Sequence, residues 1–198
     1  MIFGITGGTG CGKTTALKAI ESLGGIVLDC DAIYHELLKN DPSLLAAIEA
    51  RFPGVVENGQ LARKKLGAIV FNDPQALLDL NAITHAAIKA EVVRRLTPAP
   101  KLAAIDAIEL FDSGLAQLCH RTVAITAPLE DRVRRLMARD GISEEYARAR
   151  ISAQKEEDWF RSHCDDILEN NGNMDAFATK CVDFFRSSCI MESGEVSV

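Results

Sequence analysis

A glycine-rich segment, GITGGTGCGKTT at residues 4–15, most constrains what this chain can fold into. It follows Ile2–Thr6, an apolar and β-branched run typical of a buried strand, and it precedes apolar residues at helical spacing. These helical positions are Ala16, Leu17, Ile20 and Leu23. The segment is therefore predicted to be a loop that joins a strand to a helix.

The loop satisfies the spacing G-x-x-x-x-G-K-[ST], with Gly7 at its start and Gly12, Lys13 and Thr14 at its end. Glycines let several backbone N–H groups converge on phosphate oxygens at the positive end of a helix. Lys13 adds a charge beside the β- and γ-phosphates, and the Thr14 hydroxyl suits Mg²⁺. The dinucleotide spacing G-x-G-x-x-G is absent, because Lys13 stands where its last glycine would be.

We expect this loop to bind a nucleoside triphosphate; the alternative is a glycine-rich turn with an incidental lysine. The residues expected at the nucleotide are Gly8, Thr9, Gly10, Cys11, Gly12, Lys13, Thr14 and Thr15.

Further segments have the buried-strand pattern. They are residues 25–29, 102–106 and 122–126, with a weaker candidate near Asp166. Because helical segments alternate with these runs, they predict an α/β fold with a parallel sheet covered on both faces.

Two long helical stretches interrupt the strands. Residues 32–96 are broken at NDPSL, FPGVVENGQ and FNDPQ, and are expected to form an inserted helical subdomain. In the second stretch, Pro128 suits a first helical turn, Ser143 an N-cap, and Asp140-Gly141 the break between two helices. A last amphipathic helix begins near Asn173, and the segment SSCIMESGEVSV is expected to be a frayed tail.

The composition indicates which kinds of partner and which cellular compartment to expect for this protein. The 198 residues, 47% of them hydrophobic, suffice for one sizeable core or a core with a small subdomain, and the net charge of −6 argues against nucleic acid or an anionic membrane as the main partner. The six cysteines form no C-x-x-C pair or zinc-type spacing, so reduced thiols are expected. The N-terminal MIFGI lacks the basic region of a signal peptide, and no apolar run approaches the roughly 20 residues that span a bilayer. A cytoplasmic protein is expected.

A phosphate loop alone does not separate kinases from GTPases, ATPase motors and passive binders. The chain lacks the D-x-x-G and N-K-x-D elements of GTPases and the L-S-G-G-Q of transporter ATPases. A kinase also needs a group that orients or deprotonates an acceptor hydroxyl, and cations around the transferring phosphoryl group.

Carboxylates at strand ends are candidates for the acceptor side, because the carboxyl ends of parallel strands face the ligand crevice. Asp29 and Asp31, in the segment DCD, close the second strand, and either could reach an acceptor or instead cap the helix expected to start at Ala32. Asp106 ends the third strand, as a carboxylate that orients Mg²⁺ does, with a strand-end turn residue as the alternative.

Arginines of the second helical stretch are the candidate cations, because a planar guanidinium pairs bidentately with phosphate oxygens. They are Arg132, Arg134, Arg135, Arg139, Arg148 and Arg150. Most are expected to be surface charges or i, i+4 partners of Glu144 and Glu145. Arg139, just before the Asp140-Gly141 break, is the one expected to act in catalysis.

Beyond the loop, the chain carries in order DCDAIYHELL, LARKKLGAIVFNDPQALLDLNAITHAAI, IDAIELFDSGL, RVRRLMARDGISEEYARARISAQ and DDILENNG. This series covers nearly the whole chain and resembles the dephospho-CoA kinase family of the P-loop nucleotide-kinase class. The resemblance implies a P-loop NTPase-type five-stranded parallel sheet flanked by helices, with a helical substrate-binding insertion and a lid. The implied divisions are a core of residues 1–31, 97–127 and 160–190, a coenzyme-binding insertion of residues 32–96, and a lid within residues 128–159.

The resemblance also implies transfer of the ATP γ-phosphoryl group, with Mg²⁺, to the ribose 3′-hydroxyl of dephospho-CoA, the last step of coenzyme A biosynthesis. The residues expected to act in catalysis are Lys13, Asp31 and Arg139, and those expected at Mg²⁺ are Thr14 and Asp106. The match to the family's D-A-D motif makes Asp31 the acceptor-side base. Asn171 lies in a segment that resembles the family's adenine-side segment, although a turn alone explains Asn171-Gly172.

The chain departs from the family pattern in several places. Ala86 follows His85 where the family has proline, Cys11 replaces serine, and Ile108, Glu109 and Asp112 replace proline, leucine and glutamate. The changes beside the expected acceptor pocket bear on substrate preference. The alternatives are a kinase for another small hydroxyl or nucleotide acceptor, and a weakly active nucleotide-binding paralogue.

Cys11 carries a separate hypothesis. A thiol among backbone N–H groups at a helix N-terminus is favourably placed to form a thiolate and to be oxidised or capped. Mild oxidants are then expected to inhibit the protein in a way that ATP prevents.

Overall fold

The computed structural model describes residues 1–193, which divide into two compact units. The core unit contains residues 1–28 and 100–110 and the chain from residue 116 onward, and the helical unit contains residues 29–99 and 111–115. Within residues 1–193, no helix combines the length and the apolar character needed to cross a bilayer.

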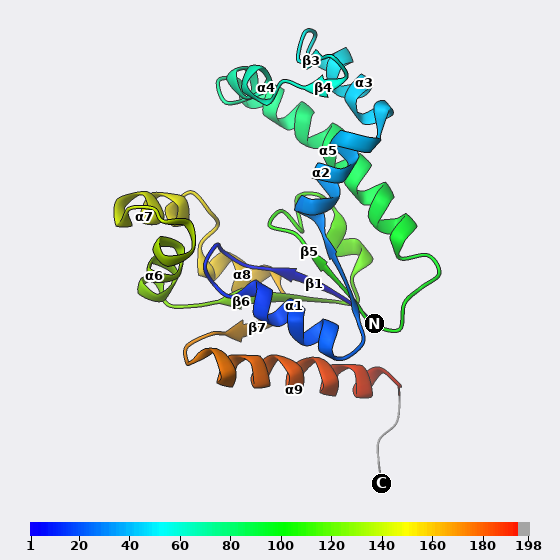
Figure 1. The fold of residues 1–198 in the computed structure, drawn as a ribbon. Coiled ribbons are helices and arrows are strands. Elements are labelled where there is room, and N and C mark those ends of the chain that lie inside the picture. The colour runs from blue at the N-terminus through cyan, green and yellow to red at the C-terminus, as the bar shows by residue number, and fades with distance from the viewer. Residues whose placement is uncertain (194–198) are drawn as a thin grey trace. The chain divides into compact units, whose positions relative to one another are not determined.

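A five-stranded sheet forms the centre of the core unit (Figure 1). Its strands are β1 (Ile2–Thr6), β2 (Ile26–Asp29), β5 (Ala103–Asp106), β6 (Arg121–Thr126) and β7 (Asp166–Glu169), in the spatial order β2-β5-β1-β6-β7. The central strand β1 runs parallel to both neighbours, with Phe3 aligned to Ala104 on one side and Arg121 on the other. The predicted five-stranded parallel sheet is confirmed, including the weaker fifth strand.

Helices cover both faces of this sheet (Figure 1). The helices α1 (Lys13–Ser22) and α9 (Met174–Ser193) pack together on one face, and α8 (Glu157–His163) packs against β6 and β7 on the other. Phe3 of β1 and Phe185 of α9 are fully buried, with their rings edge to face at 4.9 Å between centroids. An apolar contact between the first strand and the last helix therefore lies inside the core.

The expected frayed tail is wrong for residues 187–193, which continue α9. Ser188 is buried and extends the inward face of the helix, and its hydroxyl donates to the carbonyl of Phe184 at 2.9 Å. Backbone bonding of this kind satisfies a serine inside a helix, so the Ser187-Ser188 pair does not end it. Residues 194–198 lie outside the described part of the chain.

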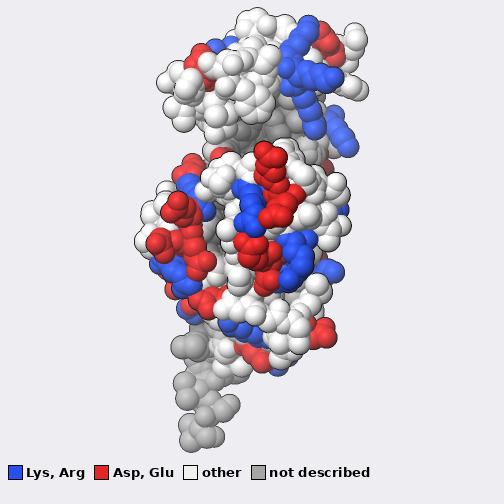
Figure 2. Space-filling view, turned by 90° about the vertical axis from the view of Figure 1, so that its left-hand side faces the viewer, with Lys and Arg blue, Asp and Glu red and all other residues white. Residues whose placement is uncertain are grey.

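The core unit also carries α6 (Leu129–Asp140) and α7 (Glu144–Ser152). Gly141, in the left-handed conformation, ends α6, and the Ser143 hydroxyl accepts the Tyr146 N–H at 3.2 Å, which confirms the predicted break and cap. Pro128 is the N-cap of α6 and not part of its first turn. On the face in Figure 2, cationic and anionic side chains are interleaved over the core unit. Arg148 of α7 forms ion pairs with Glu130 and Glu144.

Four helices and a hairpin make up the helical unit. They are α2 (Cys30–Asn40), α3 (Pro42–Arg51), β3 (Val56–Glu57), β4 (Gln60–Leu61), α4 (Arg63–Val70) and α5 (Pro74–Arg95). The helix breaks fall where the sequence predicts them, because Asp41 and Asp73 cap the next helix and each precedes a proline. The hairpin was not predicted, although its turn residues Asn58 and Gly59, both with positive φ, are the usual signal for one.

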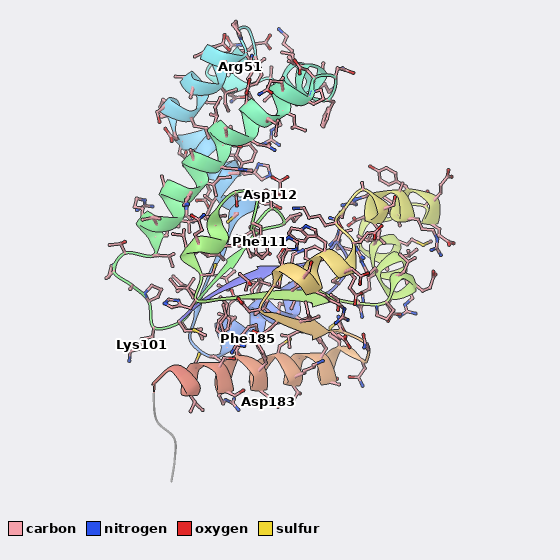
Figure 3. All side chains as sticks on the ribbon, turned by 180° about the vertical axis from the view of Figure 1, so that it is seen from behind. Arg51, Lys101, Phe111, Asp112, Asp183 and Phe185 are labelled. Atoms are coloured by element: carbon pink, nitrogen blue, oxygen red, sulfur yellow. The ribbon has the colours of Figure 1, made fainter. Side chains whose placement is uncertain are left out.

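The two faces of α9 provide a test of the packing (Figure 3). Phe185 points toward the sheet and is fully buried, whereas Asp183 lies on the opposite, exposed face. Phe185→Ala should lower the free energy of unfolding by about 3–5 kcal/mol, because it leaves a cavity beside Phe3. Asp183→Ala should change it by less than about 0.5 kcal/mol. Urea unfolding measures both, and equal effects of the two substitutions would contradict the assigned register of α9.

Candidate active site

The loop between β1 and α1 has a backbone that favours glycine at three of its positions. Gly7 has a φ of 130°, Gly10 a φ of 78° and Gly12 a φ of 103°. A Cβ atom on Gly7 would lie 2.3 Å from the Ile125 carbonyl oxygen of β6. The loop therefore starts in direct backbone contact with the neighbouring strand.

The N-terminus of α1 is open to a ligand. Gly12 is its N-cap, and no side chain from residues 1–193 caps this end, nor does its first turn contain a carboxylate. The leading N–H groups of a helix lack intrahelical partners and carry the positive end of its dipole. This end of α1 is suited to bind an anion such as a phosphate.

Lys13 lies across the loop. Its ammonium Nζ donates to the Gly7 carbonyl at 3.0 Å, and it makes no ion pair with a carboxylate of the described chain. No carboxylate within residues 1–193 therefore compensates its positive charge. Thr14, which follows it in the first turn of α1, is exposed, and Thr15 is half-buried.

Side chains from α6 and from just beyond α7 bind the other side of the loop. Arg132 donates its Nε to the Thr9 carbonyl at 3.0 Å, and Arg135 donates Nη1 to the Gly10 carbonyl at 3.1 Å. Gln154 accepts the Thr9 N–H at 2.7 Å. Arg132 and Gln154 also line a cavity of about 390 Å³, so the loop is held by groups that border an open space.

Arg139 has a different environment from Arg132 and Arg135. It donates to both carboxylate oxygens of Asp140, at 2.7 and 3.0 Å, and its side chain is 60% exposed. Hydrogen bonds from Arg139 and then Arg150 lower the pKa of Asp140 to about 2. The structure thus brings Arg132 and Arg135 to the loop and does not bring Arg139 to it. The three are at i, i+3 and i+7 of one helix, so Arg139 lies further along the same face.

The asparagine that contacts the loop is Asn170, which the sequence analysis did not single out. Its Nδ2 donates to the Cys11 carbonyl at 2.9 Å, and the residue is 5% exposed. Asn171, the expected nucleotide residue, is exposed and donates to Glu169 at 3.1 Å. Asn170 directly follows β7, so its position at the carboxyl edge of the sheet was the available signal.

The thiolate hypothesis for Cys11 is wrong for this structure. Its side chain is 2% exposed, and burial raises the pKa of the thiol above its ordinary value. The charges of Arg132 and Lys13 act in the opposite direction but do not overcome the loss of solvation. Cys11 is a small apolar side chain in the crowded turn, which is the environment of an unreactive cysteine.

The two aspartates where β2 meets α2 differ in what they contact. Asp29 caps α2, because its Oδ1 accepts the Ala32 N–H at 3.0 Å, and the helix consequently begins at Cys30 and not at Ala32. Asp31 lies in the first turn of α2 and is exposed. The capping alternative therefore applies to Asp29, and the Asp31 carboxylate is left to act on a ligand.

Asp106 ends β5 and is half-buried. Its Cα is paired in register with that of Ile5, so it lies beside the end of β1 that leads into the phosphate loop. Ile108, which replaces the proline of the family pattern, is 50% exposed, and its carbonyl accepts the Thr6 hydroxyl at 3.3 Å. The end of β5 and the start of the loop therefore lie side by side.

The parallel sheet, the glycine loop and the open end of α1 define a P-loop nucleotide-binding protein. The family model described as dephospho-CoA kinase matches residues 1–176, and the chain belongs to the dephospho-CoA kinase family. Among the curated relatives, the dephospho-CoA kinase of Thermus thermophilus is 37% identical over 177 residues, covering 88% of this chain and 85% of that protein. The dephospho-CoA kinase of Symbiobacterium thermophilum is 34% identical over 200 residues, covering 98% of this chain and 84% of that protein.

Solved structures agree with this assignment. A protein from Thermus thermophilus, 34% identical, superposes with a TM-score of 0.80 over 95% of this chain and 97% of that chain. The dephospho-CoA kinase from Campylobacter jejuni, 26% identical, superposes with a TM-score of 0.70 over 96% of this chain and 98% of that chain. Shikimate kinase from Bacteroides thetaiotaomicron, 16% identical, superposes with a TM-score of 0.57 over 95% of this chain and 97% of that chain. This is a likeness of fold alone.

The neighbouring asparagines Asn170 and Asn171 form a matched pair for a test. Asn170→Ala leaves the carbonyl of Cys11 without its buried donor, so it should destabilise the protein by about 1–3 kcal/mol and weaken ATP binding. Asn171→Ala should change stability by less than about 0.5 kcal/mol. Urea unfolding and ATP titration separate the two effects. A loss of ATP affinity with unchanged stability in Asn171→Ala alone would instead favour the expected contact of Asn171 with the base.

Proposed function

We propose that this protein transfers the γ-phosphoryl group of ATP to the ribose 3′-hydroxyl of dephospho-CoA, giving coenzyme A and ADP. The observation that carries the proposal is the phosphate loop, where Lys13 and the uncapped end of α1 provide uncompensated positive charge. The acceptor follows from the family, whose curated relatives are named dephospho-CoA kinases.

At the nucleotide end, the residues proposed to bind ATP are Gly8, Thr9, Gly10, Cys11, Gly12, Lys13, Thr14 and Thr15, with Asn171 toward the base. The loop N–H groups and Lys13 hold the β- and γ-phosphates by charge-assisted hydrogen bonds. Lys13 then stabilises the charge that shifts during transfer, and Arg132, Arg135 and Arg139 are the cations available from α6. We retain Arg139 in the catalytic set because it lies on the same helix face as the two arginines at the loop.

Mg²⁺ is the ion that this reaction would use. Thr14 offers an exposed hydroxyl and Asp106 a carboxylate beside the end of β1, and both are the hard oxygen ligands that Mg²⁺ prefers. No group of three or more His, Cys, Asp or Glu side chains within residues 1–193 forms a metal cluster, which fits an ion held largely by phosphates and water. When bound, Mg²⁺ would neutralise charge on the β- and γ-phosphates.

At the acceptor end, we assign Asp31 as the base. Its carboxylate is exposed and is not the helix cap, so it is available to accept the proton of the 3′-hydroxyl as that oxygen attacks phosphorus. The helical unit of residues 29–99 and 111–115 contains the proposed coenzyme-binding insertion of residues 32–96, and the lid is proposed within residues 128–159. A net charge of −6 and free thiols fit a cytoplasmic enzyme that acts on a small molecule and not on nucleic acid or a membrane.

The pair Asp29 and Asp31 tests the base. Asp31→Asn keeps the shape and removes the carboxylate, so kcat should fall about 10²- to 10⁴-fold while ATP still binds. Asp29→Asn is the matched control, because asparagine caps a helix about as well as aspartate, and its kcat should stay within a few-fold of the wild-type value. Steady-state kinetics and ATP titration give the answer. An unchanged kcat in Asp31→Asn would remove Asp31 from the chemistry.

An acceptor panel tests the reaction itself. With ATP and Mg²⁺, dephospho-CoA should be phosphorylated with a kcat/KM at least about tenfold above that of adenosine or AMP, because remote contacts hold its hydroxyl in line. Coupled ADP release measures the three acceptors under identical conditions. If Ile108 and Glu109 reduce this preference, Ile108→Pro with Glu109→Leu should restore it. AMP or adenosine equal to dephospho-CoA would refute the acceptor, and turnover of none would identify a passive binder.

A further inference from the structure

The arginines of the described chain fall into two groups. Ten of them form ion pairs with carboxylates. Within residues 1–193, the three that form no ion pair with a carboxylate are Arg63, Arg132 and Arg135. Two of these three contact the phosphate loop, which leaves Arg63 to be explained.

Arg63 is exposed in the first turn of α4, in the helical unit. Its Nη2 is 3.1 Å from Nδ1 of His35. Because a guanidinium can only donate, Nδ1 of His35 must be the acceptor, so the imidazole is neutral and carries its proton on Nε2. The charge of Arg63 is thus held in place by a neutral group. Burial raises the pKa of Tyr34, the residue before His35, and the positive charge of Arg63 acts in the opposite direction.

His35 connects Arg63 to the proposed base. It lies four residues after Asp31 on α2, so the two side chains occupy the same helix face about one turn apart. Both are exposed. A carboxylate, a neutral imidazole and an uncompensated guanidinium therefore follow one another on the surface of the helical unit.

We propose that Arg63 and His35 bind the diphosphate of the acceptor. The inference rests on the proposed function, in which Asp31 contacts the 3′-hydroxyl. In dephospho-CoA, the 3′-hydroxyl and the 5′-diphosphate belong to one ribose, so a site for the anion must lie near the base. Arg63 supplies the planar fork that pairs with phosphate oxygens, and the Nε2–H of His35 supplies a further donor.

This assignment makes Arg63 a specificity-determining residue. It would favour an acceptor with a diphosphate over a nucleoside, whose ribose offers Asp31 the same hydroxyl but offers Arg63 nothing. The neighbouring Lys64 differs, because it is exposed and its side chain makes no hydrogen bond or ion pair within residues 1–193. It points about 100° away around the helix. Lys64 therefore provides a control with the same change of charge.

Isothermal titration of dephospho-CoA and of adenosine tests the proposal without requiring turnover. Arg63→Met should weaken dephospho-CoA binding at least about tenfold, leave adenosine and ATP binding within about twofold, and keep the melting temperature. Arg63→Lys should restore part of the affinity, because it keeps the charge but loses the fork. Lys64→Met should bind both acceptors as the wild type does.

The outcomes separate this inference from the proposed function. If the wild type binds dephospho-CoA but does not phosphorylate it, the proposed function fails, and the Arg63 assignment stands if Arg63→Met alone weakens binding. Unchanged binding in Arg63→Met, equal losses in Lys64→Met, or equal losses for adenosine would overturn the assignment. A wild type that does not bind dephospho-CoA would overturn it as well.

Discussion

The close contact between the Gly7 backbone and the Ile125 carbonyl is the constraint on which the site depends. It lets β1 turn away from the sheet beside β6, so that α1 starts at the carboxyl edge of the central strand. Any Cβ at this position would push the strand and the loop apart. With the turn in place, the first N–H groups of α1 and the charge of Lys13 are directed to one place, the end of the sheet where Asp106 also lies.

The fold was predictable because its signals are local. Apolar runs of strand length, caps before prolines and a glycine at the end of α6 each act within a few residues, and the strands and most helix ends follow them. The exceptions have physical reasons. The Asn58-Gly59 turn was present but joins strands of only two residues, too short for an alternating pattern. The polar residues after Phe185 were predicted to end the helix but continue it, because the hydroxyls of Ser187 and Ser188 donate to backbone carbonyls of α9.

The site was less predictable, because the groups that hold its loop are set by tertiary contacts. Spacing identified Gly7, Lys13 and Thr14, but not which of several arginines would contact the loop, and Arg132 and Arg135 differ from Arg139 only in place along α6. The choice between Asn170 and Asn171 depends on which of these two residues after β7 is buried, and the structure buries Asn170 and exposes Asn171. The direction of the pKa shift of the Cys11 thiol could not be predicted without knowing how deeply the residue is buried. The same surroundings that supply positive charge also exclude water.

The phosphate motif lies in the first 15 residues, but the bonds that shape it come from the far end of the chain. The residues that contact the loop are synthesised after it, in the order Ile125, Arg132, Arg135, Gln154 and Asn170. A ribosome that has made the whole helical unit has therefore still made none of these supports. Since a chain grows from its N-terminus at about 5–20 residues per second, about 8–30 seconds pass between synthesis of the motif and synthesis of its last partner. The full set of contacts around the loop is therefore complete only once β7 and the asparagine that follows it have been made.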